Sequence, residues 1–484
     1  MRSFFDWFQN NGTADEPWLM LGKGPSFSLR TQLDLSGYRR LSLNHAVREQ
    51  PVHVAHVIDI DVIEACGETL ERNAGVVVLP WYPHVGNRVG GRTLADHARE
   101  IPQLLRLDAE GRLLWYDLST SPIRHGPGPV IQATYFSAEA ALNLLATAGV
   151  RCVRSLGVDG GSAYSRSFED LQESTLLANG RTTFDLQFEG FARTILDTGV
   201  DFAPLNRRTP ATVYVAHTPD EALQVQVLEH SIRRRASLTV EVVLLPARSR
   251  GSIRKGDGVV LTSRAQVLAD LRPLWKVEPG DLDVVVPRES ELAPGLVLVG
   301  PGLSDRIPAV ASQVLKRATA TRLAGAVPAA LQATLAPKWN PGWSRSPDVD
   351  APILCYPADG SEPWLSRSHP LGHLWTRDLL DAISRGFIRT DAVAEQVALG
   401  HVRPSLLYQI EQGLEEPLLL RGRARRMDRD FRPAQQTEVA TSRQPQWSSI
   451  LQAVARQLGR RTRALRQRAG HRQPPSNSGL VIRQ

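Results

Sequence analysis

A glycine-rich turn is the first part of the chain whose residues could bind a ligand. The apolar run Trp18-Leu19-Met20-Leu21 predicts a short buried strand, and Gly22-Lys23-Gly24-Pro25-Ser26 follows it directly. Glycines allow the backbone to turn sharply, and the exposed amides of such a turn can hold a phosphate. Lys23 would add positive charge and Ser26 a hydroxyl donor. The spacing matches neither a Walker loop nor a full dinucleotide fingerprint, so a plain tight turn explains the same residues equally well.

A pair of acids, Asp59 and Asp61, follows a longer apolar run at residues 52–58. Two carboxylates one residue apart at the end of a strand can hold Mg²⁺ or Mn²⁺ and join it to a diphosphate. Both side chains face the same way only if the strand continues through them. Asp61 could instead cap a helix that begins there. Metal binding and a structural role therefore remain alternatives for this pair.

Three histidines are candidates for a general base that would deprotonate an acceptor hydroxyl. His84 lies in a loop after a predicted strand, His125 lies in the Gly- and Pro-rich segment HGPGP, and His45 is the third. An imidazole near its ordinary pKa can accept such a proton at neutral pH. The alternative for each is a surface position or a satisfied position in the core.

These candidates must be positioned by a sheet. Continuous apolar runs predict parallel strands that are covered on both faces, at residues 18–21, 40–44, 52–58 and 75–79, and a further strand is expected at 153–156. Residues 136–148 form an amphipathic helix, with Ser137 as its expected N-cap. Ligands of open α/β sheets bind at the carboxyl ends of the strands, where the glycine-rich turn and the acids stand.

Two later motifs share this arrangement. Asn44 ends the second predicted strand, and Gly157-Val158-Asp159-Gly160 ends another. With the turn at residues 22–26, they resemble the nucleotide-binding motifs of bacterial sialyltransferases and of the related motility accessory factor and archaeal pterin diphosphokinase-like proteins. The resemblance covers roughly residues 15–170. It implies a phosphorylated nucleotide or nucleotide sugar as the ligand, contacted by the turn, Asn44, Asp159 and Gly160.

A second strand–helix–strand unit begins after residues 207–210, where we place a domain boundary. Its segments 213–216, 219–234 and 239–245 resemble the opening of retaining transferases related to glycogenin and the lipopolysaccharide galactosyltransferases. Later motifs agree in order: Trp339-Asn340 resembles their Trp-Asn motif, and Cys355-Tyr356 with Pro363-Trp364 resembles their His-Tyr and Pro-Trp region. The resemblance implies a GT-A-like lobe.

The second lobe departs from this family where a metal ion would bind. Such enzymes carry Asp-x-Asp after the central strand, because two carboxylates hold the ion that neutralises the departing diphosphate. The matching strand, residues 258–261, is followed here by Thr262-Ser263-Arg264, and Cys355 replaces a metal-ligating histidine. Arg264 could supply the missing charge. The simpler expectation is a degenerate site, comprising Thr262, Arg264, Cys355 and Trp364, that serves binding or scaffolding. The tryptophans of this lobe could stack on a sugar or pack a loop onto the sheet.

Arginines concentrate after position 421, where acids are few, so the tail accounts for the net charge of +7. This favours attachment to an acidic surface over specific nucleic-acid binding. Apolar positions spaced three and four apart predict an amphipathic helix over residues 446–468. A helix on a membrane surface and a helix docked on the body fit this pattern equally well.

The 484 residues, 42% of them hydrophobic, provide material for two to three domains. No apolar run is long enough to span a bilayer, and the first residues lack the apolar region of a signal peptide. The three cysteines, Cys66, Cys152 and Cys355, lack the spacing of a disulfide framework. We therefore expect a cytoplasmic protein, at most peripheral to the inner face of the membrane.

The sequence thus predicts an α/β protein of two Rossmann-like (GT-A-like) lobes with mostly parallel sheets: a nucleotide-binding lobe at 1–206, a degenerate glycosyltransferase lobe at 207–424, and a basic, partly disordered helical tail at 425–484. The leading hypothesis is transfer of a sugar from a nucleotide donor in the first lobe to a glycan or envelope-polysaccharide acceptor, for which a divalent metal is compatible but not required. The alternatives are a non-catalytic nucleotide- or glycan-binding scaffold and a Mg²⁺-dependent diphosphokinase-like enzyme that uses Asp59 and Asp61.

Overall fold

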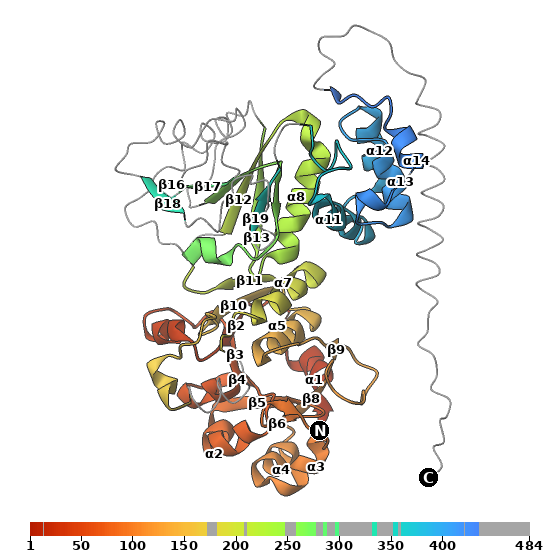
Figure 1. Cartoon of the computed structure of the whole chain (residues 1–484). Helices are drawn as coiled ribbons and strands as arrows, with labels where there is room; N and C mark the ends of the chain where they lie inside the picture. The colour runs from red at the N-terminus through yellow and green to blue at the C-terminus, as the bar shows by residue number, and fades with distance from the viewer. Residues whose placement is uncertain are drawn as a thin grey trace, which may run out of the picture.

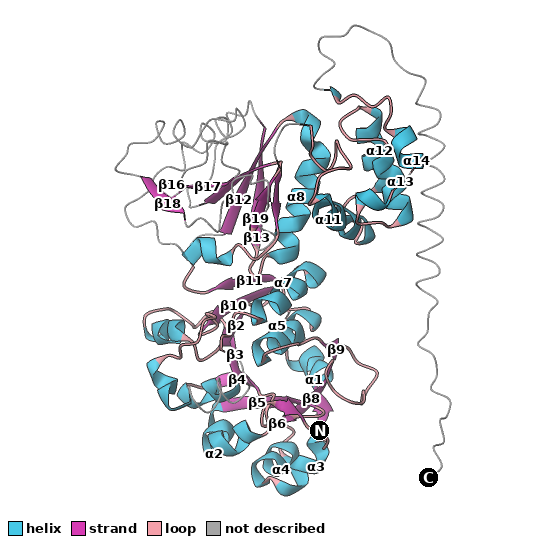
Figure 2. Ribbon diagram, viewed as in Figure 1, coloured by secondary structure: helices cyan, strands magenta, loops and turns pink. Residues whose placement is uncertain are grey.

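The computed structural model describes residues 1–12, 14–171, 182–207, 211–246, 258–276, 284–287, 296–299, 332–335, 352–356, 360–420 and 422–434. They form two α/β lobes, with a group of helices beside the second lobe (Figure 1, Figure 2). Among the described helices, none combines the length and the apolar character needed to cross a bilayer. The helix predicted at 446–468 and the predicted Trp-Asn motif at 339–340 lie outside the described residues.

The first lobe is built on a nine-stranded sheet whose neighbouring strands pair in parallel. Its strands are β1 (Arg2–Ser3), β2 (Trp18–Leu21), β3 (Arg39–Leu43), β4 (Val52–His56), β5 (Ala74–Pro80), β8 (Leu113–Leu118), β9 (Val130–Ile131), β10 (Cys152–Leu156) and β11 (Asp201–Pro204). Their order in space is β1-β8-β5-β4-β3-β2-β10-β11, with β9 beside β8. Strands β3, β4, β5 and β8 extend to one side of β2, and β10 and β11 lie on the other. The crevice between β2 and β10 is therefore a topological switch point, where open α/β sheets bind ligands.

Both faces of this sheet are buried, because successive side chains of a strand point to opposite faces. In β2, Trp18 and Met20 belong to the core under α1, α5 and α7, whereas Leu19 and Leu21 belong to the core under α2, α3 and α4. The helices of this lobe are α1 (Phe4–Asn11), η1 (Pro25–Thr31), η2 (Asn44–Glu49), α2 (Asp61–Asn73), α3 (Leu94–Glu100), α4 (Pro102–Ala109), α5 (Ser137–Thr147), η3 (Arg166–Leu171) and α7 (Gln187–Thr198). The predicted parallel sheet with two covered faces is confirmed.

The predicted N-cap of α5 is wrong. Ser137 is the first residue of the helix, and Phe136 occupies the cap position. The carboxylate of Glu139, which is almost fully buried, accepts hydrogen bonds from the amides of Thr134, Tyr135 and Phe136 at 2.9–3.0 Å. Glu139 thus satisfies the amides that precede the helix, and Ser137 lies in the first turn instead.

The second lobe contains a six-stranded sheet in the order β13-β12-β14-β17-β16-β18. Its strands are β12 (Ala211–His217), β13 (Val240–Pro246), β14 (Gly258–Thr262), β16 (Val284–Pro287), β17 (Leu296–Val299) and β18 (Gln332–Leu335). The first three are parallel, and β17 runs antiparallel to both of its neighbours. A separate antiparallel pair joins β15 (Ala265–Val267) to β19 (Ile353–Cys355). The α/β class with two mostly parallel sheets is confirmed.

The helices of the second lobe are η5 (Pro219–Glu221), α8 (Ala222–Arg235), η6 (Arg272–Lys276), α11 (Gly372–Ser384), α12 (Thr390–Ala398), α13 (Ser405–Gln412), η10 (Pro417–Leu419) and α14 (Arg423–Met427). Helices α11, α12 and α13 pack beside α8 around a shared apolar cluster, while η10 contacts α11 and α14 contacts α13 (Figure 1). Asp428, which falls within the predicted tail, accepts hydrogen bonds from Arg367 Nε at 2.9 Å and Ser405 Oγ at 2.6 Å. The chain as far as residue 434 is thereby attached to this helical group.

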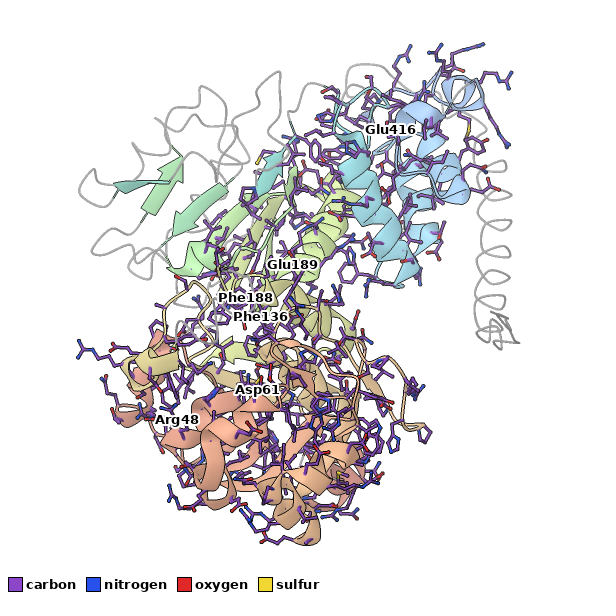
Figure 3. The ribbon with its side chains drawn as sticks, turned by 60° about the horizontal axis from the view of Figure 1, so that its bottom comes forward. Arg48, Asp61, Phe136, Phe188, Glu189 and Glu416 are labelled. Carbon is purple, nitrogen blue, oxygen red and sulfur yellow. The ribbon has the colours of Figure 1, made fainter. Side chains whose placement is uncertain are left out.

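The two lobes share one hydrophobic core. Thr239 of the second lobe donates its amide to the Phe202 carbonyl at 2.7 Å, and its Oγ1 accepts from the Phe202 amide. Arg272 enters the first lobe, where its guanidinium lies 3.6 Å from the ring centroid of Phe188 and donates to the Val158 carbonyl at 3.0 Å. Figure 3 shows Phe188 at this junction. The lobes are thus joined by packing and by buried polar contacts.

Candidate functional site

The two glycine turns predicted to bind a nucleotide meet at the switch point. The Gly24 amide donates to the Gly157 carbonyl at 2.8 Å. A Cβ atom on Gly22 would lie 2.2 Å from that same carbonyl oxygen, and Gly157 itself has a φ of +74°. Glycine is required at both positions, since a side chain would separate the turns. The carboxyl ends of β2 and β10 are therefore held in backbone contact.

Ser26 and Asp159 connect these turns directly. The Ser26 amide donates to Asp159 Oδ2 at 2.7 Å, and the Gly157 amide donates to Ser26 Oγ at 2.7 Å. Pro25 begins the short helix η1. The serine hydroxyl therefore supports the turn itself, a role that the sequence alone could not distinguish from ligand binding.

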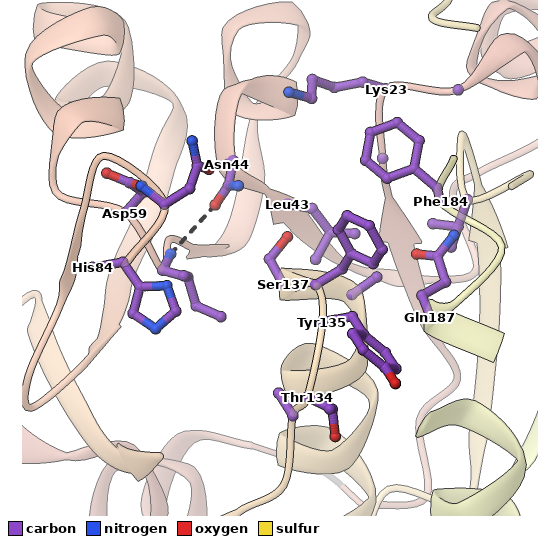
Figure 4. Close-up of a pocket in the computed structure, with 18 of the residues that line it drawn as sticks. Lys23, Leu43, Asn44, Asp59, His84, Thr134, Tyr135, Ser137, Phe184 and Gln187 are labelled. Carbon is purple, nitrogen blue, oxygen red and sulfur yellow. Dashed lines mark hydrogen bonds between the residues drawn. The ribbon is translucent and has the colours of Figure 1, made fainter. Parts of the chain in front are cut away.

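A cavity of about 440 Å³ opens over these turns and the neighbouring strand ends (Figure 4). Of the predicted site residues, the structure brings to its wall Gly22, Lys23, Gly24, Asn44, Asp59, His84, Asp159 and Gly160. The remaining first-lobe candidates do not line it: Pro25, Ser26, His45, Asp61 and His125. Residues from the ends of β2, β3, β4, β8 and β10 and from the loop before α5 thus enclose one space.

Lys23 is one of the two cations of this wall, with Arg88 of the neighbouring segment as the other. Burial lowers the pKa of its ammonium from 10.5 to about 8. Its Nζ lies 4.6 Å from the ring centroid of Tyr164, a distance at which an ammonium is attracted to an aromatic face. A lysine whose charge is poorly solvated gains from the approach of an anion.

Asn44 has a strained backbone, with φ at +47° directly after β3. Its Oδ1 accepts a hydrogen bond from the Ile58 amide at 3.3 Å, drawn dashed in Figure 4. Such a conformation persists only where its surroundings enforce it, and it often marks a functional site. Asn44 thereby links the ends of β3 and β4 at the cavity.

The acids Asp59 and Asp61 hold a β-hairpin. Strand β4 ends at His56 and α2 begins at Asp61, so the strand does not continue through the pair. Asp59 accepts from the Asn87 amide at 2.6 Å, and Asp61 accepts from the Gly86 amide at 2.9 Å. Burial raises the pKa of Asp59. Among the described residues, no three His, Cys, Asp or Glu side chains gather as metal ligands would. Each of the two carboxylates thus anchors one amide of the hairpin turn.

The hairpin itself was not predicted. It consists of β6 (His84–Val85) and β7 (Arg88–Val89), joined by Gly86 and Asn87, which have φ values of +56° and +61°. Glycine and asparagine tolerate the positive φ that a two-residue hairpin turn requires, so the Gly-Asn pair was the available signal. Asn87, Arg88 and Val89 line the cavity, and Val85 and Val89 are exposed.

The three histidines differ in position. His84 lines the cavity, burial lowers its pKa, and its buried Nε2 has no hydrogen-bond partner among the described residues. His125 stacks on Trp81, with ring centroids 3.5 Å apart, and donates its amide to Asp117. Burial lowers the pKa of His45 to about 4, and His45 is not in the wall. Only His84 therefore meets the cavity as a neutral imidazole.

The second-lobe candidates also come together, but in structural contacts. Arg264 forms an ion pair with Glu221 at 3.2 Å, and its carbonyl accepts from the Tyr356 amide at 3.0 Å. Cys355 pairs with Ala265 across β15 and β19, and burial raises the pKa of its thiol to about 12. Thr262 ends β14.

The Trp364 ring is buried against Tyr356 and Trp375. Its indole is thus part of the core and offers no exposed face for stacking on a sugar. Of the two readings of these tryptophans, packing of the loop holds for Trp364 and Trp375.

No protein-family model and no curated protein sequence matches the chain. Among solved structures, parts of the chain are similar to glycosyltransferases. These include the bifunctional WbbM (12% identity, 39% of this chain and 52% of that chain, TM-score 0.28) and GlyE of Streptococcus pneumoniae (14%, 37% and 64%, TM-score 0.27). A third is the galactosyltransferase LgtC in complex with donor and acceptor sugar analogs (12%, 37% and 100%, TM-score 0.22). The chain thus spans about half of WbbM and less than two thirds of GlyE.

Proposed function

We propose that this chain is a glycosyltransferase-like protein that binds a nucleotide sugar in the first-lobe cavity and transfers the sugar to a glycan acceptor. The observation that carries the proposal is the convergence of two glycine turns, the ammonium of Lys23 and the imidazole of His84 on one cavity at the switch point. A poorly solvated ammonium in the cavity wall suits the phosphates of a nucleotide.

His84 is the proposed base. Because its pKa is lowered, its imidazole is neutral at pH 7 and can take the proton of an acceptor hydroxyl as the sugar leaves the phosphate. His125 is less suited, since its ring is stacked on Trp81. The preference for His84 therefore follows from its place at the cavity.

Donor binding in this proposal does not require a divalent metal. Asp59 and Asp61, the acids that would hold one, already accept backbone amides of the hairpin. The charge of the phosphates would instead be met by Lys23 and Arg88, the two cations of the cavity wall. The second lobe is proposed to be non-catalytic, since the guanidinium of Arg264 is already paired with Glu221.

Titration calorimetry with CMP, UDP, GDP, ATP and UDP-glucose, each in EDTA and in Mn²⁺, tests the proposal. We expect one nucleotide to bind in EDTA, and Lys23→Met to weaken it by about tenfold or more, since a charge-assisted hydrogen bond is lost. The control is Arg151→Met, a highly exposed cation outside the cavity wall. If no nucleotide binds the wild type, the proposal fails. His84→Gln is expected to bind the donor normally and to lose transfer and donor hydrolysis.

A non-catalytic nucleotide- or glycan-binding scaffold is the second candidate. It is favoured by the second lobe, where Arg264, Cys355 and Trp364 serve internal contacts. Nucleotide binding without donor hydrolysis in any acceptor mixture would support the scaffold. Binding and turnover that depend on Mg²⁺ would instead favour the diphosphokinase-like alternative.

A further inference from the structure

The cavity has two chemically different ends (Figure 4). Asn44, Asp59 and His84 form a polar end beside the hairpin. On the opposite side stand Phe184 and Gln187. The aromatic end extends through Phe184 to two further rings that also line the cavity, those of Phe136 and Tyr164. A ligand that is complementary to this cavity is polar at one end and flat and apolar at the other.

The aromatic end is a connected wall. The Phe184 ring lies 5.1 Å from that of Phe136 and 5.7 Å from that of Tyr164, the latter pair being stacked with 22° between their planes. Tyr164 also carries the ammonium of Lys23 over its face. A planar ring that stacked against this wall would have its substituents within reach of the Lys23 ammonium, since Tyr164 belongs to the wall and also contacts that ammonium.

Gln187 adds a polar group to this wall. It is the first residue of α7 and is only 4% exposed, yet its side chain lines the cavity. Its carboxamide makes no hydrogen bond to any described residue, although its backbone amide donates to the Phe184 carbonyl. A carboxamide that lines a cavity without a protein partner can donate to and accept from a ligand or water there.

We infer that this end of the cavity is a nucleobase subsite, in which the base stacks against the wall of Phe136, Tyr164 and Phe184 and the Gln187 carboxamide reads its hydrogen-bonding edge. The inference rests on the proposed function, and it sets the orientation of the nucleotide, with the phosphates toward Lys23 and the hairpin. A carboxamide both donates and accepts, which matches the mixed edge of a base. An aromatic wall alone would not distinguish one base from another.

The test compares the affinities of UDP, CDP, ADP and GDP, with inorganic pyrophosphate as the probe that lacks a base. In Gln187→Leu, which keeps the volume and removes the polar group, we expect the preference among the four nucleotides to fall toward unity while pyrophosphate binds as before. In Gln187→Glu, which can only accept, the ratio of CDP to UDP affinity is expected to rise, because cytosine offers an amino donor where uracil has a carbonyl. Phe184→Leu is expected to weaken every nucleotide about fivefold or more without affecting pyrophosphate.

Glu189→Gln, an exposed position on the same helix, is the matched control and is expected to behave as wild type. Unchanged pyrophosphate binding also shows that each variant is folded. If nucleotides bind the wild type and both Gln187 variants keep its base preference, the subsite is refuted while the proposed function stands. If no nucleotide binds the wild type, both fail.

Discussion

At the scale of single residues, Lys23 has the clearest consequence for pH dependence. Burial lowers the pKa of its ammonium to about 8, so the charge is present below that pH and is lost above it. An anionic ligand needs the charged form. Affinity is therefore expected to be highest below pH 8 and to fall as the pH rises through that value.

We expect the dissociation constant for a nucleotide diphosphate sugar, whose phosphates do not titrate in this range, to increase about tenfold between pH 7 and pH 9. Lys23→Arg is expected to remove this dependence, because a guanidinium stays protonated throughout. Calorimetric titrations at four pH values measure the dissociation constants of the wild type and of Lys23→Arg. An equally steep profile in Lys23→Arg would mean that another group titrates.

Ser26 gives a second prediction at this scale. Its hydroxyl accepts from the Gly157 amide, so Ser26→Ala leaves a buried donor unpaired and is expected to lower the free energy of unfolding by about 1–2 kcal/mol. Ser28→Ala is the control, because its exposed hydroxyl only donates to the Pro25 carbonyl, and a change within about 0.5 kcal/mol is expected. Urea denaturation compares the two. Equal destabilisation would show that the bond to Gly157 is unimportant.

At the scale of elements, the hairpin β6–β7 depends on the start of α2. Its turn residues have positive φ values, and its amides are held by Asp59 and Asp61. The hairpin also forms part of the cavity wall through Arg88 and Val89. Loss of an anchoring carboxylate is therefore expected to loosen one wall of the site while leaving the sheet intact.

We expect Asp61→Ala to accelerate hydrogen exchange at the Gly86 amide about tenfold, because the loss of one hydrogen bond to a charged acceptor lowers its protection. Amides of β4 and β5 are expected to keep their exchange rates. Glu64→Ala, at an exposed position of the same helix, provides the comparison. An unchanged rate at Gly86 would show that Asp61 does not hold the turn.

At the scale of the whole molecule, Arg272 joins the lobes at the cavity. It is 5% exposed, and burial lowers its pKa to about 10. Its guanidinium stacks on Phe188 and donates to Val158, which itself lines the cavity, while burial raises the pKa of neighbouring Asp270. The second lobe thus supports a turn of the first-lobe site, which gives it a role independent of any chemistry of its own.

We expect Arg272→Met to lower the free energy of unfolding by about 2–3 kcal/mol, since the buried Val158 carbonyl loses its charged donor and the Phe188 ring loses a desolvated cation. Arg385→Met also breaks a contact between the lobes, the exposed ion pair with Asp197, and is expected to cost at most about 1 kcal/mol. Scanning calorimetry measures both variants. Similar losses in the two would mean that the lobes are not joined mainly through Arg272.

Much of the framework could be predicted from the sequence because it depends on neighbouring residues. Continuous apolar runs identified the central strands β2 and β5, since a strand buried on both faces favours apolar side chains at successive positions. The glycines at 22, 24 and 157 marked the turns, because positive φ or close backbone approach excludes other residues.

The tertiary structure alone decided which residues share the cavity. His84 and His125 look alike in the sequence, and only the path of the hairpin brings His84 to the wall. Ser26 and Asp159 are 133 positions apart, so their mutual contact followed from β2 and β10 being neighbours. No feature of the sequence indicated Gln187 as a ligand-binding residue. A carboxamide at the start of a helix points to binding only when the folded structure buries it in a cavity wall without a hydrogen-bond partner. Local composition thus determines where strands and turns form. A site at the edge of the sheet depends on the order of the strands in space, because that order decides which strand ends are neighbours.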